Sequence, residues 1–429
     1  MNLTIHCGSD QIGGSCVELE AGGARVIIDI GLPLTAADGG RLDARELAGK
    51  TVDELLALKL LPNLTGLYKG QDKKYDAVLI SHAHADHCGL LSHIHPDIPV
   101  YMSRGTQEII EVSGLFTPIK AENANIRAVD GRQTFDIGGM RVTPFVVDHS
   151  AFDALAFLVE AGGKKVFYSG DFRGHGRKSV LFQRMVDDPP RNIDCLLMEG
   201  TSVGNSDRAY GDEKVVERQI EEILQSAGPV TFLCMSSQNI DRVVSAYKAC
   251  RRANAVFVVD IYTAYLLDRL RKIAPGIPAA DWRGMRICFV KRQADILAEQ
   301  VSKQLLYHYN GRKIKSGDMN RGGKYLMLLR NNSHYSKFLK GLRAARGAKA
   351  VYSMWGGYID DSFRHFCADF ELEIEEVHAG GHASVEALQS FAKALNPRIL
   401  VPIHTFSPEK YRSLFENVRM AGDGERIEV

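Results

Sequence analysis

The chain has 429 residues, enough for two or three domains with large buried cores. Its apolar fraction of 45% and charged fraction of 24% are those of an ordinary globular protein, which excludes a disordered or fibrous chain. Lysine and arginine number 53 against 52 aspartate and glutamate, so the overall charge by itself indicates neither a nucleic-acid nor a membrane partner.

The eight cysteines are scattered, without a Cys-x-x-Cys pair, which predicts reduced thiols in a cytoplasmic protein. Residues 1–16 have no basic start followed by an apolar segment, so we expect no secretion signal. The most apolar stretch, 255–267, is interrupted by Asp260 and is shorter than the roughly 18 apolar residues of a membrane span. We therefore expect no membrane partner.

The apolar pattern changes along the chain. Residues 3–198 hold short β-branched runs closed by Gly, Asp or His, which predict strands of about five residues in stacked sheets. From residue 212 to 353, amphipathic helices alternate with short apolar strands, the pattern of an open, largely parallel α/β sheet. The tail returns to strand, helix and strand at 372–377, 385–395 and 398–402.

These patterns predict an α/β protein in which one domain is inserted into another. The tail is too short to form a domain alone, so we expect it to complete the first one. The predicted boundaries are 1–204 for the first part of this domain, 205–371 for the insertion and 372–429 for the completing part.

The strongest chemical signal is the run Ser81-His82-Ala83-His84-Ala85-Asp86-His87, directly after the predicted strand 77–80. Its three imidazoles and one carboxylate are ligands that suit zinc or manganese. A single tetrahedral site would use three of these groups and a water, whereas two neighbouring sites would use all four. The alternative is a solvated polar turn, in which clustered histidines would repel one another when protonated.

Three further candidates lie in the same context, at the C-terminal end of a predicted strand: His149, Asp171 and His404. A lone histidine is more often a hydrogen-bonded core or surface residue, and a lone Gly-Asp is more often a turn. The position that the three share favours a common site.

Several of these residues resemble the motifs of a known fold. Asp29, the run His82–His87, His149 and Asp171 are similar to the four motifs of the metallo-β-lactamase fold. The resemblance implies a metallo-β-lactamase αββα sandwich that holds an inserted β-CASP α/β domain.

Four further places, from Glu199 onward, resemble the β-CASP nucleases. Glu199 in Met-Glu-Gly-Thr-Ser, His382 in His-Ala-Gly-Gly-His-Ala-Ser and His404 in Pro-Ile-His-Thr are similar to their motifs A, B and C, and Ser236–Val243 is similar to an RNase J segment. Motif C carries a histidine in RNA-cutting members and usually lacks it in DNA-cutting ones. The resemblance therefore implies an RNase J-like hydrolase of single-stranded RNA, acting as a 5′-to-3′ exonuclease, an endonuclease or both.

Three alternatives remain open at this stage. One is a single-strand DNA nuclease of the same architecture, and another is a non-catalytic RNA-binding β-CASP subunit, against which the complete ligand set argues. A small-molecule hydrolase is the last. The oligomeric state is also open, a homodimer included.

The family pattern also implies a role for each site residue. His82, His84 and His149 hold one metal, Asp86, His87 and His404 hold the other, and Asp171 bridges the two. The implied ions are two divalent metals, zinc as the first choice and manganese as the alternative, which activate a water for in-line attack on phosphorus.

Four residues are expected to take part in catalysis: Asp86, His382, Glu199 and Asp29. Asp29 and Glu199 would orient the water or a ligand imidazole. His382 would hydrogen-bond the scissile phosphate or protonate the departing 3′ oxygen, and a loop residue that caps a helix is the alternative interpretation.

Phosphate contacts are expected just before the predicted helix 385–395, whose N-terminal amides would attract an anion. The candidates are His378, Gly380, Gly381 and Ser384. RNase J proteins usually carry Ser before Gly-His, where this chain has Gly380-Gly381-His382, so one phosphate-binding hydroxyl is missing.

The neutral total conceals a strong local charge. Residues 283–349 carry 16 Lys and Arg against 3 Asp and Glu, a net of +13, which suggests a face for a polyanion. The cluster Arg312, Lys313 and Lys315 is expected to contact RNA. Aromatic residues interleave with the basic ones and are expected to stack on unpaired bases: Tyr307, Tyr309, Tyr325, Tyr335 and Phe338. The alternative is a set of solvated helix faces with tyrosines in the core.

Overall fold

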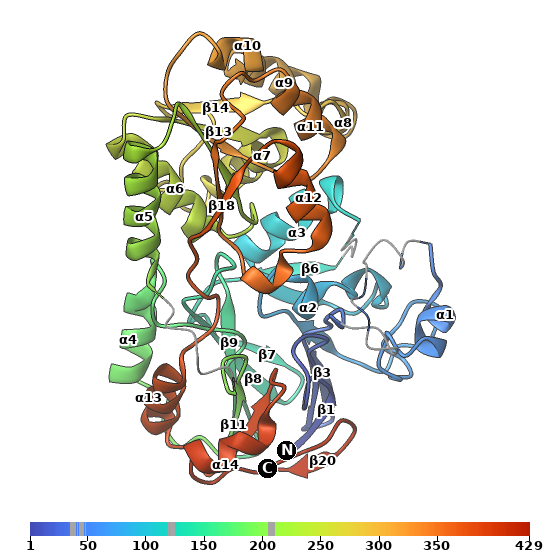
Figure 1. Ribbon diagram of the computed structural model, residues 1–429. Helices are drawn as coiled ribbons and strands as arrows, with labels where there is room; N and C mark the ends of the chain where they lie inside the picture. The colour runs from blue at the N-terminus through green and yellow to red at the C-terminus, as the bar shows by residue number, and fades with distance from the viewer. Residues whose placement is uncertain are drawn as a thin grey trace. The chain divides into compact units, whose positions relative to one another are not determined.

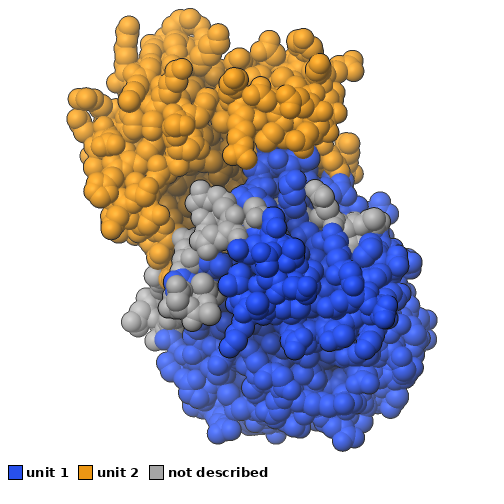
Figure 2. All heavy atoms as spheres, turned by 90° about the vertical axis from the view of Figure 1, so that its right-hand side faces the viewer, with its two compact units in different colours: residues 1–209, 381–429 blue, residues 210–380 orange. Residues whose placement is uncertain are grey.

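The computed structural model describes residues 1–34, 40, 42, 47, 49–118, 120, 125–204 and 211–429 (Figure 1). The chain forms two compact units, which Figure 2 colours separately. Unit 1 consists of residues 1–209 and 381–429, and unit 2 of residues 210–380. No helix in the described ranges is long and apolar enough to cross a membrane.

Unit 1 contains two mixed β-sheets. The first has the strand order β20-β1-β2-β3-β4-β5-β6. Its strands are β1 (Asn2–Cys7), β2 (Cys16–Ala21), β3 (Ala24–Ile28), β4 (Ala77–Leu79), β5 (Val100–Ser103), β6 (Ile126–Val129) and β20 (Arg426–Glu428). The pairs from β3 to β6 are parallel, so these strands end at the same edge.

The second sheet has the order β19-β11-β10-β9-β8-β7. Its strands are β7 (Phe135–Ile137), β8 (Met140–Val146), β9 (Leu155–Ala161), β10 (Lys164–Tyr168), β11 (Cys195–Glu199) and β19 (Ile399–Ile403). Strands β10, β11 and β19 run parallel, although β19 comes from the end of the chain. The C-terminal segment therefore completes the fold of the N-terminal one.

The two sheets of unit 1 share an apolar core that contains Val26 and Leu79 of the first sheet and Phe157 and Leu197 of the second. Another core packs the second sheet against α4 (Ser179–Asp187) and α13 (Val385–Leu395). The first sheet contacts α3 (Arg104–Phe116). The layers are thus helix, sheet, sheet and helix, which confirms the predicted αββα fold class.

Short helices complete unit 1: α1 (Val52–Ala57), α2 (Ala85–Cys88), η2 (Leu91–His93), η5 (Pro408–Lys410) and α14 (Tyr411–Leu414). The cap of α1 illustrates local control by sequence. Thr51 accepts from the Glu54 amide, and the Glu54 carboxylate accepts from the Thr51 amide, a reciprocal pair that satisfies two amides at the helix start.

Unit 2 is an open, fully parallel sheet of order β15-β14-β13-β16-β12-β17-β18. Its strands are β12 (Val230–Cys234), β13 (Val256–Asp260), β14 (Met285–Cys288), β15 (Lys313–Ile314), β16 (Tyr325–Leu328), β17 (Lys349–Tyr352) and β18 (Glu373–Glu376). The helices are α5 (Glu213–Ser226), α6 (Ile240–Arg252), α7 (Ile261–Leu270), α8 (Lys291–Ile296), the π-helix η3 (Leu297–Ser302), α9 (Lys303–Asn310), α10 (Ser316–Met319), α11 (Ser333–Lys340), η4 (Gly356–Tyr358) and α12 (Asp361–Asp369). This is the predicted alternation of helix and strand.

The end of the insertion differs from the sequence prediction. Sequence analysis assigns 372–377 to the first domain, but β18 pairs in parallel with β17 and belongs to the sheet of unit 2. The sequence predicted this strand correctly but assigned it to the wrong sheet. Alternation of apolar residues indicates a strand, but it does not indicate which sheet edge the strand joins. Unit 2 therefore extends to residue 380. The other predicted boundary adjoins 205–210, which lie outside the described residues.

Candidate metal centre

The seven candidate ligands follow four strand ends of unit 1. The run His82–His87 follows β4 and includes α2, His149 follows β8, Asp171 follows β10 and His404 follows β19. Five of the seven side chains are buried, and His84 and Asp86 are partly exposed. The structure therefore places all seven in one part of one unit.

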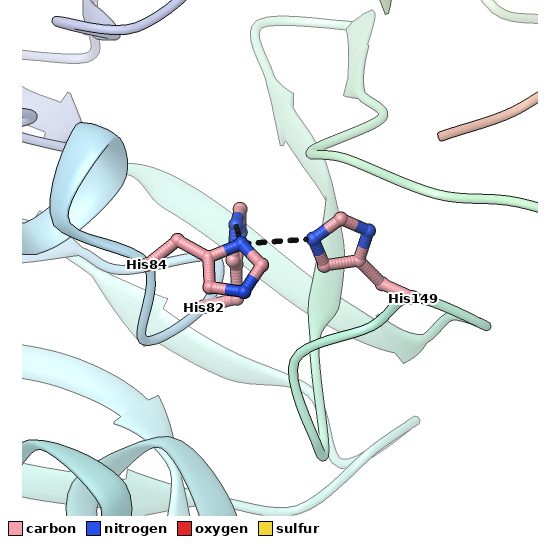
Figure 3. Close-up of side chains that lie close together, drawn as sticks. All are labelled: His82, His84 and His149. Atoms are coloured by element: carbon pink, nitrogen blue, oxygen red, sulfur yellow. Dashed lines mark hydrogen bonds between the residues drawn. The ribbon is translucent and has the colours of Figure 1, made fainter. Parts of the chain in front are cut away.

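Three imidazoles converge at the first end of this cluster. His84 Nδ1 lies 3.2 Å from His82 Nε2 and 3.2 Å from His149 Nε2, and Figure 3 shows the three rings turned toward one another. The His149 Nδ1–H donates to the Gly381 carbonyl oxygen at 2.7 Å, so in the neutral ring Nε2 keeps its lone pair. Three imidazole nitrogens that lie this close together are a ligand set that fits a metal ion.

The surroundings keep these imidazoles neutral. Burial lowers the pKa of His84 to about 4. Burial together with neighbouring imidazoles lowers the pKa of both His82 and His149 well below the ordinary value. The neutral ring is the form that binds a metal.

Asp171 lies beside the other ligands. Its Oδ2 is 3.1 Å from His87 Nε2 and 3.8 Å from His82 Nε2, and its Oδ1 is 3.7 Å from His404 Nδ1. The other imidazole nitrogen of His404, Nε2, is 3.3 Å from Asp86 Oδ2. Asp171 thus neighbours members of both predicted ligand sets, a position that fits the predicted bridge.

Buried polar atoms without a hydrogen-bond partner gather here. Within the described residues they include both carboxylate oxygens of Asp171, His87 Nε2 and His382 Nδ1. Each such atom costs about 1–3 kcal/mol when it stays unsatisfied. Imidazole nitrogens and carboxylate oxygens are ligands of zinc and manganese, so the cluster fits divalent ions on chemical grounds.

The Asp171 carboxylate is held in the charged form. Against the effect of burial, His404 and His87 keep the pKa of Asp171 well below its usual range. Also against burial, Asp171 and Asp29 raise the pKa of His87 well above its ordinary value. The buried carboxylates around His87 therefore favour positive charge.

Asp29 stands behind the ligands rather than among them. Its Oδ1 accepts from the Ser81 amide at 2.7 Å, and its Oδ2 accepts from Ser81 Oγ and Tyr168 Oη at 2.7 Å each. His87 Nδ1 lies 2.8 Å from the same Oδ2. Of the two roles left open for Asp29, the geometry supports the one of orienting an imidazole.

Glu199 and His382 form a linked pair. Glu199 accepts from the Thr201 amide at 3.0 Å and from the Ala383 amide at 3.2 Å. His382 Nδ1 lies 3.5 Å from Glu199 Oε1 and 3.6 Å from Asp171 Oδ2. Against the effect of burial, Glu199 and Asp171 raise the pKa of His382 to about 9. A cationic imidazole thus stands beside the candidate ligands.

The predicted phosphate contacts divide between the two units. His378 and Gly380 belong to unit 2, and Gly381 and Ser384 belong to unit 1. Ser384 caps α13, where its Oγ accepts from the Ala387 amide at 3.3 Å. Gly381 supplies the carbonyl that holds His149, and a Cβ in its place would lie 2.9 Å from Ser150 Oγ.

The predicted RNA contacts Arg312, Lys313 and Lys315 lie at one edge of the sheet of unit 2, on and around β15. Arg312 donates to the Asp281 carbonyl at 3.0 Å, and Lys313 Nζ is 4.6 Å from the centre of the Phe289 ring. Both Lys313 and Lys315 are exposed.

The prediction of stacking tyrosines is largely wrong. Tyr309 and Tyr335 are fully buried and Tyr325 is 8% exposed, whereas Tyr307 is 78% exposed. Tyr325 and Tyr335 belong to the apolar core of unit 2, and Tyr309 donates to Asp268 at 2.7 Å. Tyrosines alternate with basic residues in this stretch because its helices are amphipathic, with the apolar face directed into the core.

Sequence reasoning missed one contact to a candidate ligand and one buried ion pair next to two others in the sequence. Thr201 Oγ1 lies 2.9 Å from His404 Nδ1. Arg173 Nε lies 3.5 Å from Asp148 Oδ1, and both side chains are fully buried. Their positions in the sequence could have indicated them, because Asp148 precedes His149 and Arg173 follows Asp171 by two positions.

Comparison with known proteins supports this picture. Residues 55–258 match the model of the Beta-lactamase superfamily domain. An "RNase J-like protein" of Methanocaldococcus jannaschii is 26% identical over 61% of this chain and 58% of its own length. A "Ribonuclease J" of Mycoplasma genitalium is 22% identical over 92% of this chain and 66% of its own length. The chain thus spans 58% and 66% of these two curated relatives.

A solved structure has the same fold. It is a protein of unknown function from Enterococcus faecalis, with a TM-score of 0.79 at 21% identity and 99% of both chains covered. By the matched domain and the curated relatives, this chain is similar to metallo-β-lactamase proteins of the RNase J type.

Proposed function

We propose that this protein is a metal-dependent ribonuclease that hydrolyses phosphodiester bonds of single-stranded RNA. The observation that carries the proposal is the buried cluster of imidazoles and carboxylates at the strand ends of unit 1, with its unsatisfied oxygens on Asp171. The names of the RNase J-type relatives support RNA as the substrate.

Two ligand sets account for the cluster. His82, His84 and His149 would hold one divalent ion, while Asp86, His87 and His404 would hold a second, with Asp171 in reach of both. Bound there, such ions supply an activated water and a positive charge for a phosphate oxygen. Zinc is the first choice because nitrogen ligands dominate, and manganese is the alternative.

The remaining residues position these groups and the substrate. Asp29 orients His87 through its hydrogen bond, and Glu199 holds the turn that carries His382. His382 would then donate a hydrogen bond to the scissile phosphate or to the departing 3′ oxygen. Amides at the start of α13, next to Gly381 and Ser384, would face the same anion.

A cytoplasmic location is part of the proposal, because all eight cysteines are free.

The test compares substrates directly. Purified protein is incubated with 5′-labelled or 3′-labelled RNA, with single-stranded DNA of the same sequence and with duplex RNA, and the products are sized over time. Single-stranded RNA should be degraded much faster than DNA, and the duplex should resist. Mononucleotide products indicate an exonuclease, and discrete fragments indicate an endonuclease. Faster turnover of DNA would refute RNA as the substrate and favour a DNA nuclease of the same fold.

A further inference from the structure

Two aromatic side chains of unit 2 are exposed next to each other. Trp355 is 45% exposed and Tyr358 43% exposed, and their ring centroids are 5.1 Å apart at an interplanar angle of 88°. Single exposed hydrophobic residues are normal on a protein surface. An exposed tryptophan in edge-to-face contact with an exposed tyrosine is less common, and together the two rings present a larger aromatic surface.

The turn that carries the pair is shaped around the rings. Trp355 precedes the short helix η4, whose first two residues are glycines. A Cβ at Gly357 would lie 2.5 Å from the Trp355 ring, and a Cβ at Gly356 would lie 2.5 Å from Glu376 Oε2. A side chain at either glycine would therefore push the Trp355 ring or the Glu376 carboxylate aside, so the two glycines leave room for the ring position seen here.

The pair lies where open parallel sheets bind ligands. It follows the carboxyl end of β17, which lies next to β12 in the sheet. After β12 the chain continues toward the β15 edge, to β13, whereas after β17 it continues toward the opposite edge, to β18, so the strand order reverses between β12 and β17. Ligands of such sheets bind outside the carboxyl ends of the strands at this reversal.

A buried arginine contacts both the segment before the aromatic turn and residues 378–379, which precede His382 in the sequence. Arg242 is fully buried and donates to the Ser353 carbonyl at 2.7 Å and to the Ala379 carbonyl at 3.2 Å. Ser353 Oγ in turn donates to the Val377 carbonyl at 2.5 Å. The turn and the residues that lead toward His382 are therefore fixed to the same guanidinium.

We propose that Trp355 and Tyr358 form a stacking site for an unpaired base of single-stranded RNA. The inference rests on the proposed function and adds a contact for its substrate. Aromatic faces stack on any base, so the site would bind without sequence preference. The acidic residues Glu376, Asp360 and Asp361 adjoin the pair in space or in sequence and disfavour a phosphate there, so the proposed contact is with the base alone.

The electrostatic attraction for the strand would come from elsewhere in the same unit. Residues 283–349 carry the net charge of +13. Basic side chains there would attract phosphates at a distance and in a salt-dependent manner. Stacking on the aromatic pair would add binding free energy that depends far less on the salt concentration.

The tryptophan content allows a direct test. The chain has only two tryptophans, Trp282 and Trp355, so Trp282→Phe leaves Trp355 as the single tryptophan, whose emission can be excited selectively. A nuclease-resistant phosphorothioate RNA of about ten nucleotides should quench and shift the emission of this variant. Trp355→Ala should weaken RNA binding roughly ten-fold, whereas Trp355→Phe, which keeps an aromatic face, should bind nearly as the wild type does.

Matched controls separate stacking from structure and from catalysis. Trp282 packs on Tyr247 at 5.4 Å, away from the proposed site in the fold of unit 2, so Trp282→Phe alone should leave the RNA affinity unchanged. Unaltered emission with RNA, or unaltered affinity in Trp355→Ala, would overturn the stacking site. If RNA is still cleaved in that case, the proposed function stands without it. If Trp355→Ala changes only the oligomeric state in sedimentation, the pair belongs to a protein interface and the proposal is wrong.

Discussion

Asp29 and His404 adopt a backbone conformation that side chains other than glycine rarely take. Their φ angles are 62° and 53°, in the left-handed region. Such conformations cost of order 1–3 kcal/mol each and persist where the surrounding structure fixes them. His404 is fixed by its amide, which donates to the Gly8 carbonyl at 2.7 Å, and Asp29 is fixed by its amide, which donates to the Leu79 carbonyl at 2.8 Å. Eight other non-glycine residues in the described ranges also have positive φ, so this conformation is not confined to the candidate site, but there it occurs at a candidate ligand and at the carboxylate that contacts His87.

The central carboxylate gives the first prediction. Asp171→Asn keeps the shape of the side chain and removes the charge that its neighbours stabilise. We expect metal content to fall from about two ions per chain and RNA cleavage to be lost, while RNA binding remains. Metal analysis and a cleavage assay on the same preparation measure both effects. Asp136→Asn, at a carboxylate that is 68% exposed, is the control and should change neither. Full activity in Asp171→Asn would remove the bridging role.

A buried ion pair gives the second prediction. Arg173→Met leaves Asp148 as a buried carboxylate without this guanidinium, which should lower the free energy of unfolding by about 3–5 kcal/mol. Arg398→Met removes an arginine that is 77% exposed and should cost about 1 kcal/mol or less. Urea unfolding curves of the two variants compare the costs directly. Equal costs would show that the Asp148 carboxylate does not depend on Arg173.

At the scale of elements, the candidate site depends on strands that end together and on close backbone contacts behind them. Gly31, just after β3, lies against α2, and a Cβ there would be 1.7 Å from the Asp86 carbonyl oxygen. The adjacent Leu32 amide donates to the Ala85 carbonyl at 2.8 Å. These contacts fix the short helix that carries Asp86 and His87.

The third prediction follows from that contact. Gly31→Ala must displace α2, so both the free energy of unfolding and the metal content should fall. The loss of free energy should be about 1–3 kcal/mol. Gly228→Ala is the matched control, because a Cβ there meets no atom within 4 Å. Thermal unfolding and metal analysis of the two variants provide the comparison. A Gly31→Ala protein with wild-type metal content would show that α2 can move without disturbing the ligands.

The sequence predicted elements better than their partners. Helix α13 occupies 385–395 as predicted, because its apolar spacing and its Ser384 cap are local signals. The positions of the candidate ligands His149 and Asp171 at strand ends were also predictable, since each follows an apolar run. Their supports were not, because these contacts join distant positions: Ser81 and Tyr168 are 52 and 139 residues from Asp29. The assignment of β18 failed for the same reason.

At the scale of the whole molecule, a neutral chain contains one strongly basic stretch. Part of this charge is balanced inside unit 2, because Arg330 pairs with Asp260 at 2.9 Å and Lys349 pairs with Glu375 at 3.1 Å. A polyanion would be a counterpart for the rest. The three basic residues around β15 lie at one edge of the seven-stranded sheet of unit 2, and β18 lies at the other.

The fourth prediction concerns salt dependence. Each phosphate contact contributes roughly 0.7 to the slope of log affinity against log salt for a single strand. Replacing Arg312, Lys313 and Lys315 by glutamine should flatten this slope and weaken binding to all sequences about equally, without loss of metal. The control replaces Arg104, Arg141 and Arg398 of unit 1, which are 65%, 65% and 77% exposed. The same slope in both triple variants would reduce the β15 cluster to a solvated surface.

The central claim is that the buried cluster of unit 1 cleaves RNA with bound divalent ions. Its most direct test is the cleavage rate of labelled single-stranded RNA by chelator-treated protein as Zn²⁺ or Mn²⁺ is returned, with bound metal measured on the same samples. The rate should be near zero without metal and should rise with occupancy toward about two ions per chain. Cleavage that persists undiminished after complete removal of metal, or no cleavage of any RNA at full occupancy, would contradict the claim.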